Sequence, residues 1–594
     1  MKEKKRGKRE RGGFLRIGAN EKTDSFLVIL FGLFSISSLL LEYAAFHFKG
    51  PFSLAASRIW FFMGVLTFLY IAVRFVHAAL WRNLREGKWL DLLLLVILFF
   101  AFCRVLGNVK LYDLSYEAAL EVRDALQGLI LADGNYTGAG FWGYPARQYI
   151  FNALPTLLLG RSLFALQLGF GLYFILGICC LYTGLRQRCV SAGVNTVAAV
   201  LPLYVLFVFP YVTEYYLSFD QVLNPAAYGM CLIGLFLLLT DTKPCFPDAL
   251  GFLWLGCMSS FVYPQALSLT VIAAAFVFIY LLMGLRQGVK NRAVAFPVEN
   301  PLALSELFVL ILVDIIGYLV ISYQTTPATQ SLMAVRGSFP EVVLGVLRES
   351  FSDIHGVFWG GTALFVVFWI IWCMTGCFTC RDLVLVLWML GVFISGQLIL
   401  GYANASPETL KSRFILVIPF LLTAVSLHAV KGLSETEKRL RIRTVISFCL
   451  ACGFFIWINF STAGKVNPVV QPRSSFLIQD IEAVLEEEGL TDEDAFEIIL
   501  LSDDLVSNLY DYTGYFYPNA RVIYAGQDDE PGYDPSLFTV LYDSKAIAEK
   551  YEGKEVRGTA GFVYKDQRRG EEYAIYHGIL TEGEAFSVVL DEQQ

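Results

Sequence analysis

Residues 90–106 read LDLLLLVILFFAFCRVL, which is fifteen apolar residues interrupted by Asp91 and Arg104. A helix needs about 20 mostly apolar residues to cross the hydrocarbon core of a bilayer. Twelve other segments have a similar character, so the sequence predicts a polytopic α-helical membrane protein of about 13 transmembrane helices. The predicted spans are 25–47, 57–80, 90–106, 163–184, 191–210, 222–240, 248–262, 264–284, 304–323, 355–378, 381–402, 413–430 and 442–460.

The composition of the 594-residue chain agrees with this interpretation. It is 56% hydrophobic and only 17% charged, whereas an ordinary soluble protein carries about 25% charged residues. Its mean hydropathy is +0.56. This excludes a typical soluble globular protein, and the apolar content excludes an intrinsically disordered chain.

The charge is divided between two regions. The net charge is −7, but residues 461–594 carry −17 and the first 460 residues carry +10. Bases gather in the basic tail 1–24 and in alternate short loops, which by the positive-inside rule predicts a cytoplasmic N-terminus. We therefore expect a multi-pass protein of the cell membrane, anchored by its first span, with residues 461–594 outside. Because the bases flank apolar spans, we expect no nucleic-acid partner.

Three predicted outer segments are longer than simple connections, namely 107–162, 324–354 and 461–594. The last is predicted to be an extracytoplasmic α/β domain. Its expected helices are 476–490 and 544–551, and its expected strands are 497–501, 521–525, 537–542, 562–565 and 573–580. An aromatic cluster around Tyr515 and Tyr517 indicates either a packed loop or a surface for stacking on sugars.

The twelve cysteines do not indicate a disulfide framework, because none follows Cys452 and the soluble domain has none. Cys373, Cys377 and Cys380 are closely spaced, but no fourth ligand for zinc is evident. The sequence leaves any metal site unknown.

The first outer segment combines two predicted amphipathic helices, 116–131 and 146–159, with a glycine- and aromatic-rich stretch at 138–144. Such helices lie well in a membrane interface. Asp113 follows the third span directly, where a carboxylate faces both lipid-borne and aqueous reactants. It is either a general base or an ordinary loop acid that caps a helix.

These residues carry a resemblance. The order Asp113-x-x-Tyr116, amphipathic helix, glycine-rich turn, Pro145 and then Leu159-Gly160-Arg161-Ser162-Leu163-Phe164 resembles the first outer loop of GT-C superfamily glycosyltransferases. These enzymes use polyprenyl-phosphate sugars, and they include protein O-mannosyltransferases and aminoarabinose transferases of lipid A.

Two later stretches resemble the same superfamily. Ser218-Phe219-Asp220-Gln221 is similar to its second outer-loop acid, and Arg413-Phe414 to Pro419 is similar to a late span that opens with an arginine. The resemblance covers roughly residues 107–430 and implies a GT-C-like transmembrane domain over 25–460.

The resemblance implies a transfer of sugar from a polyprenyl-phosphate carrier to a hydroxyl of an outer acceptor, which is a cell-envelope glycan, a lipid or a protein. Asp113 would be the general base, and Asp220 a second acid that binds acceptor or metal. Arg413, Arg336 and His355 would bind the donor phosphate, and Tyr116 and Tyr144 would line the acceptor loop. A divalent cation, Mg²⁺ or Mn²⁺, is a possible cofactor. The predicted outer side also offers Lys110, Arg123, Arg147, Arg161 and Arg348 as cations.

Alternatives stay open at this point. A transporter or flippase of lipid-linked glycans would place charges deep in several spans, and only Asp314 is clearly deep. An enzyme of the O-antigen ligase type would depend on outer-loop Arg and His. A non-catalytic envelope scaffold also remains, because Leu114 stands where the family usually carries a further acid.

Overall fold

The structure is a computed structural model. The residues it describes are 40, 51–108, 122, 125–126, 129, 149–208, 223–239, 275, 423, 426–427, 430, 433–434, 438–439, 441–442, 445–446, 481–491, 493–501, 513–525, 534, 536–544 and 573–579. Within these ranges, no helix combines the length and the apolar character needed to cross a membrane. The number of spans therefore stays a prediction.

Helices occupy the positions that the apolar segments predict. Each of five expected spans overlaps one helix, with ends that differ by up to several residues, and the second amphipathic segment of the first outer loop forms another. These helices are α2 (Pro51–Arg85), α3 (Trp89–Asn108), α5 (Tyr149–Leu159), α6 (Leu163–Ser191), α7 (Val197–Val208) and α9 (Leu223–Leu239). In the first amphipathic segment, the described residues 122, 125, 126 and 129 are helical. Three of them, Val122, Ala125 and Leu129, are buried.

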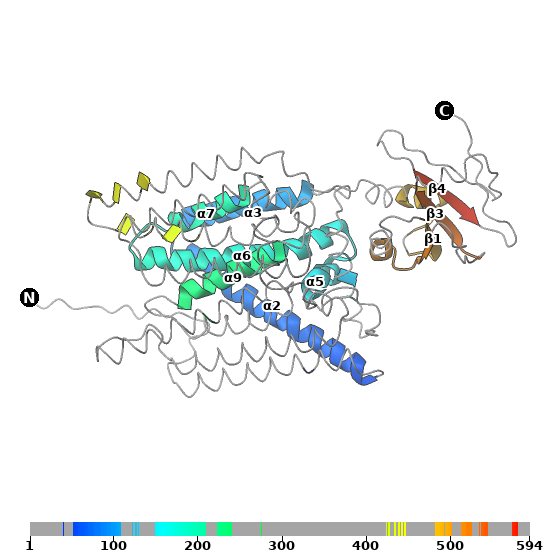
Figure 1. Ribbon diagram of the computed structural model, residues 1–594, viewed down its shortest axis with the longest axis horizontal. Coiled ribbons are helices and arrows are strands. Elements are labelled where there is room, and N and C mark those ends of the chain that lie inside the picture. Colours follow the sequence, from blue (N-terminus) through cyan, green and yellow to red (C-terminus); the bar gives the residue numbers. More distant parts are fainter. Residues whose placement is uncertain are drawn as a thin grey trace, which may run out of the picture.

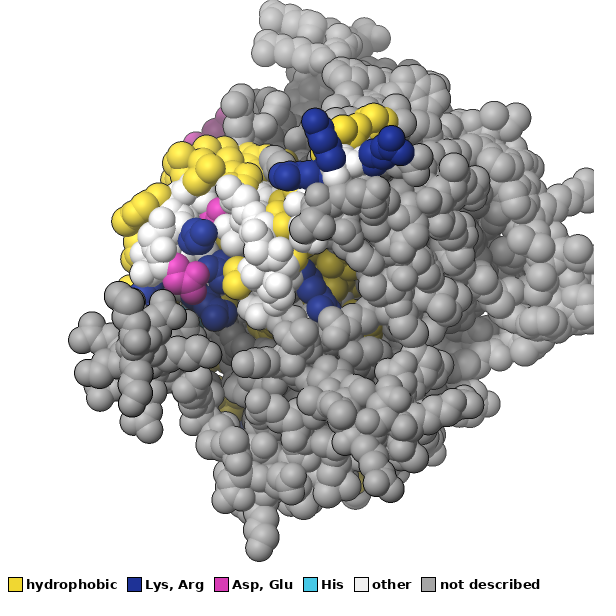
Figure 2. Space-filling model, turned by 90° about the vertical axis from the view of Figure 1, so that its left-hand side faces the viewer, with side chains coloured by type: hydrophobic (Ala, Val, Ile, Leu, Met, Phe, Trp, Pro, Cys, Tyr) yellow, Lys and Arg dark blue, Asp and Glu magenta, His cyan; other side chains and the backbone are white. Residues whose placement is uncertain are grey.

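The long helices lie side by side, with the C-terminal sheet beyond one end of them (Figure 1). At the opposite end, α2 turns into α3 and α6 ends. The exposed bases Arg82, Arg85 and Lys88 lie in that turn, and Figure 2 shows Lys and Arg side chains gathered on this face. The structure thus places the bases of the α2–α3 turn and Arg188 of the last turn of α6 at one end of the helices.

Buried polar side chains join three helices near this basic end. Tyr182 of α6 donates a hydrogen bond to Asp91 Oδ2 of α3 at 2.8 Å and accepts one from Asn83 Nδ2 of α2 at 2.7 Å. Arg186 Nε donates to Asn83 Oδ1 at 2.8 Å, and Arg186 also pairs with Glu86. Because buried polar groups need partners, this network fixes how α2, α3 and α6 meet.

Helices α6 and α9 approach each other so closely that glycine is required at their contact. A Cβ added at Gly184 would lie 2.6 Å from Gly234 O, and one at Gly177 would lie 2.7 Å from Ala227 O. At Gly234, an added Cβ would collide with the carbonyl of Cys180. Small residues let the two backbones pack directly. The pairing of 177 with 227 and 184 with 234 also shows that the two helices run parallel.

Large apolar side chains are exposed along α2 and α3. On α2 they include Phe62, at 63% exposed, and Val73, also at 63%; on α3 they include Phe100, at 65%. Exposed Trp81 and Trp89 lie near the basic turn. Apolar side chains of this size are more often buried in soluble proteins.

The C-terminal domain contains a four-stranded sheet in the order β2-β1-β3-β4. Its strands are β1 (Phe496–Leu501), β2 (Arg521–Ala525), β3 (Phe538–Ser544) and β4 (Tyr573–Ile579). The first three are parallel, with Ile498 opposite Val522 and Val540, and β4 pairs antiparallel with β3. The sequence predicted these four strands, whereas its fifth, 562–565, lies outside the described residues.

Strand β1 forms the centre of this domain. Phe496, Ile498, Ile499 and Leu500 are fully buried, as expected for a parallel strand covered on both faces. The described part of the predicted acidic helix, 481–488, buries Ile481 and Leu485 and exposes its glutamates. An α/β fold is thus present in the described part of 461–594.

Candidate functional site

The side chains that the sequence predicts for the site lie outside the described residues. They are Asp113, Tyr116, Tyr144, Asp220, Arg336, His355 and Arg413. Their roles stay predictions. The described residues contain no group of His, Cys, Asp and Glu that would hold a metal ion, and the cysteine group at 373–380 also lies outside them.

The described helices nevertheless locate the chain on either side of the two predicted acids. Asn108 ends α3 five residues before Asp113, and Leu223 begins α9 three residues after Asp220. Helix α3 runs antiparallel to α6, because Asp91 contacts Tyr182 whereas Phe102 stacks on Phe174. Since α9 runs parallel to α6, Asn108 and Leu223 both lie toward the end where α6 begins.

That end is built around the turn that joins α5 to α6. Gly160 adopts φ +84°, a conformation that glycine reaches without strain, and its N–H donates to Thr156 O at 2.9 Å. Ser162 then caps α6, accepting a hydrogen bond on its side chain from Ala165 N at 3.2 Å. The GT-C-like motif of residues 159–164 is therefore a helix–turn–helix junction.

Arg161 points from this turn to the C-terminal domain. Its Nη1 donates to Gly514 O and to Tyr515 O, each at 3.0 Å. These carbonyls belong to a single helical turn at 513–516, and carbonyls at a helix C-terminus lack intrahelical partners. Arg161 was one of the outer cations considered for phosphate binding, but in this structure its Nη1 holds the domain.

Tyr515 reaches from the domain into the α5–α6 turn. Its side chain is fully buried, with 2.7 Å between its Oη and Thr156 Oγ1. The same hydroxyl donates to Ser162 O at 3.3 Å. Because that bond uses the single tyrosine hydrogen, the threonine hydroxyl is the donor in the other. Burial raises the pKa of Tyr515 above its usual value, so the phenol stays neutral here.

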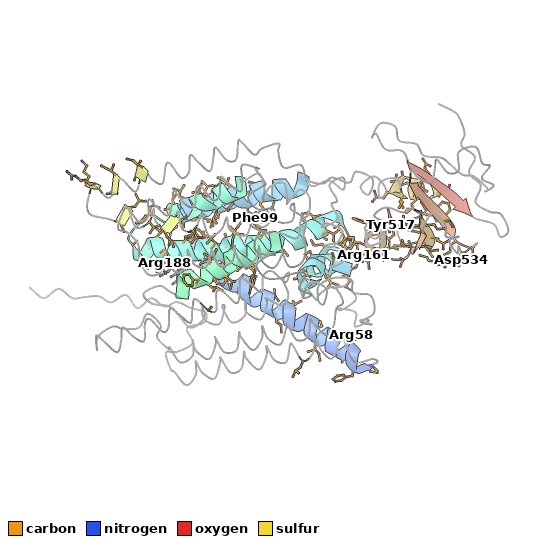
Figure 3. The ribbon with its side chains drawn as sticks, viewed as in Figure 1. Arg58, Phe99, Arg161, Arg188, Tyr517 and Asp534 are labelled. Carbon is orange, nitrogen blue, oxygen red and sulfur yellow. The ribbon has the colours of Figure 1, made fainter. Side chains whose placement is uncertain are left out.

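The aromatic cluster is a packed turn at Tyr515 and Tyr517. Tyr517 is buried and meets the ring of Phe496 edge-on, with the ring centroids 5.7 Å apart. Tyr515 likewise meets Phe516, at 5.2 Å. Of the two interpretations that the sequence left open, packing describes these two tyrosines. Figure 3 shows Arg161 and Tyr517 where the helices meet the C-terminal domain.

The contact between Thr156 and Tyr515 was absent from the sequence-based prediction. The two residues are 359 positions apart, and neither belongs to a pattern that indicates a long-range partner. The only signal was that Arg161 falls in a motif and that Tyr515 falls in an aromatic cluster.

Comparison with known proteins shows a similarity to solved structures. No protein-family model matches the sequence, and no curated protein is similar to it. The chain is similar to ArnT from Cupriavidus metallidurans in the apo state (12% identity, TM-score 0.49, 83% of this chain and 98% of that one). It is also similar to the same protein bound to undecaprenyl phosphate (13%, 0.47, 82% and 98%). A third similar structure is an oligosaccharyltransferase from Archaeoglobus fulgidus in complex with Zn and sulfate (11%, 0.36, 81% and 72%).

Proposed function

We propose that this protein is an integral-membrane glycosyltransferase that moves a sugar from a polyprenyl-phosphate carrier to a hydroxyl group on the outer side of the membrane. The ordered set of motifs from Asp113 to Pro419 carries this proposal. The exposed apolar faces of α2 and α3, with bases gathered at one helix end, support its membrane location.

The proposed reaction is a single inverting displacement. The acceptor oxygen forms a bond to the anomeric carbon while the bond from that carbon to the phosphate oxygen breaks. Asp113 accepts the hydroxyl proton, and the polyprenyl phosphate leaves with the electron pair. Arg413, Arg336 and His355 would offset its negative charge, since preorganised donors stabilise charge that develops in the transition state.

Asp220 would complete the site from the other side, either by orienting the acceptor or by binding a divalent cation. The helices α3 and α9, which end and begin close in sequence to the two acids, support a shared location for them. The proposal names the donor and the acceptor by class: a polyprenyl-phosphate-linked sugar and a molecule with a free hydroxyl group.

A donor-consumption assay tests this function. Purified full-length protein in nanodiscs is incubated with candidate polyprenyl-phospho-sugars and a hydroxyl acceptor, with Mg²⁺, with Mn²⁺ or with EDTA. We expect the release of free polyprenyl phosphate together with a matching amount of glycosylated acceptor. In sealed proteoliposomes, transport of the intact lipid-linked sugar across the bilayer without any bond cleavage would instead identify a flippase.

A further inference from the structure

Two parts of the chain meet at the α5–α6 turn, where one short segment of each is joined to the other by hydrogen bonds. On the domain side this segment is 513–517, and on the helix side it is 156–162. Among the described elements, no strand of the sheet packs broadly against a helix of the bundle. The hydrogen bonds of the α5–α6 turn are therefore the specific contacts that join the domain to the helices within the described residues.

The segment 513–517 is firmly attached to its own domain. Tyr517 packs edge-on against Phe496 at the start of the central strand, and its N–H donates to Thr513 O at 2.8 Å. Thr513 and Tyr517 are both buried. This turn therefore moves with the sheet, and whatever holds the turn holds the domain.

The attachment to the helices is polar and specific. The hydroxyl of Tyr515 satisfies Thr156 Oγ1 and Ser162 O together, and Arg161 satisfies the carbonyls of Gly514 and Tyr515. These groups would all find water as a substitute if the domain moved away, so the net contribution of each bond is modest. A contact of this kind is selective in position but reversible.

We propose that Tyr515 and Arg161 are the positioning residues that hold the C-terminal domain on the α5–α6 turn, with Thr156 as the receiving side chain. Breaking this contact is expected to release the domain as an intact unit. It would at the same time loosen the turn that closes the first predicted outer loop. This inference rests on the contacts alone and holds whether or not the proposed transfer reaction is found.

The test uses full-length protein in nanodiscs and measures hydrogen–deuterium exchange in peptides that cover 156–166. Tyr515→Phe removes both hydroxyl bonds and keeps the ring, and Arg161→Ala removes both carbonyl bonds. A typical hydrogen bond corresponds to a factor of roughly threefold to tenfold in an equilibrium. We therefore expect exchange in this segment to rise by about that factor in each variant. Arg161→Lys, which retains one charged donor, should restore part of the protection.

A variant on the helix side of the contact keeps the test independent of the folding of the C-terminal domain. Thr156→Val lies on α5, preserves the side-chain shape and leaves the domain's sequence intact. It should raise exchange in the same segment. In the double variant Thr156→Val/Tyr515→Phe, the rise in the exchange rate should be smaller than the product of the two single rises. The reason is that both changes remove the bond between Thr156 and Tyr515.

The matched control is Asn519→Ala. Asn519 donates to Glu493 O at 3.1 Å within the domain and belongs to no described contact with the helices. Exchange over 156–166 should stay at the wild-type value in this variant. The domain's own melting transition should also be unchanged in Thr156→Val and Arg161→Ala.

Wild-type exchange over 156–166 in Tyr515→Phe, Arg161→Ala and Thr156→Val would overturn the proposal. So would an effect of Asn519→Ala equal to theirs. Exchange needs no substrate, so its result is separate from that of the donor-consumption assay. A protein without transferase activity but with the expected exchange pattern would refute the proposed function and leave this inference standing.

Discussion

Asp113 is the residue on which the proposed chemistry depends most directly. It follows α3 by five residues, so the chain leading to it leaves the helices at the end where α6 begins and where the C-terminal domain docks. A carboxylate at such a boundary can accept a proton from an aqueous acceptor while the donor lipid stays in the membrane. The sequence places Asp113 five residues after the end of α3, and its role as the general base is a prediction.

Replacing Asp113 by Asn should abolish sugar transfer while the protein remains folded and inserted. Loss of a general base costs roughly 10²–10⁴-fold in rate. Release of polyprenyl phosphate by the purified variant measures this loss, and Asp133→Asn, in the same predicted outer segment, is the control. Wild-type turnover in Asp113→Asn would show that another group takes the proton.

Arg413 is expected to bind the phosphate of the donor. An arginine offers a planar fork that matches phosphate oxygens, so Arg413→Ala should weaken donor binding more than acceptor binding. Titration with a non-transferable polyprenyl phosphate measures the donor affinity. Lys411→Ala, two residues away, is the control for general loss of positive charge. Unchanged affinity in Arg413→Ala would remove this residue from the site.

At the scale of elements, the helices divide into those joined by polar side chains and those joined by backbone contact. Near the basic end, Asn83, Asp91, Tyr182 and Arg186 link α2, α3 and α6. Helices α6 and α9 are joined instead through glycine. A network of buried polar groups specifies orientation, and glycine contacts specify distance, so together they position the ends from which the predicted site residues extend.

The α6–α9 contact makes a direct prediction. Gly234→Leu places side-chain atoms where the Cys180 carbonyl already lies, and overpacking of this kind typically costs about 1–3 kcal/mol. The thermal unfolding midpoint of the full chain in nanodiscs should therefore fall. Val190→Leu, at an exposed position of α6, should leave it unchanged. Equal midpoints for the two variants would mean that the helices separate without cost.

For the whole molecule, charge is divided along the same axis as the fold. The described bases of the α2–α3 turn lie at one end of the helices, and the acidic C-terminal domain lies beyond the other (Figures 1 and 2). This is the arrangement that the positive-inside rule predicts for a chain with an outer acidic domain. Which end faces the cytoplasm remains a prediction, and accessibility of single cysteines to a membrane-impermeant reagent would test it.

The domain should lose stability in acid. Hydrogen bonds from the backbone and side chain of Thr491 lower the pKa of Asp494, and those from Ser536 lower the pKa of Asp534. Carboxyl groups with lowered pKa values stabilise the folded state above their unfolded-state values, near pH 4, and this contribution is lost as the pH falls through the folded-state values. The melting temperature of the domain transition, measured from pH 7 downwards, should therefore fall below about pH 4 through loss of this contribution.

The double variant Asp494→Asn/Asp534→Asn provides the comparison for this acid effect. It should show a flatter dependence on pH than the wild type, because two of the groups that gain protons on unfolding are gone. If both proteins followed the same curve, other carboxyl groups would account for the acid sensitivity.

The sequence by itself indicated where the described helices and strands lie, to within several residues at their ends, because hydrophobic length and pattern act over neighbouring residues. Ser544 is an exception: the sequence predicted that it begins a helix, 544–551, whereas it ends β3 in the structure. The segments 57–80, 90–106 and 163–184 are helical as predicted. The described strands are short apolar runs that are bounded by turn residues. The separation of a basic helical region from an acidic C-terminal region is also evident from the sequence alone. The predicted site residues were found through short motifs, and their roles are still to be tested.

Only the tertiary structure decided which distant residues meet. Thr156 and Tyr515 are 359 positions apart, and the central place of β1 between β2 and β3 is a matter of sheet order. Such contacts depend on shape and on pairing of buried polar groups across the whole fold, for which the local sequence carries no periodic signal. For the same reason the sequence offered Arg161 only as a phosphate ligand, whereas in the structure it donates hydrogen bonds to Gly514 O and Tyr515 O of the C-terminal domain.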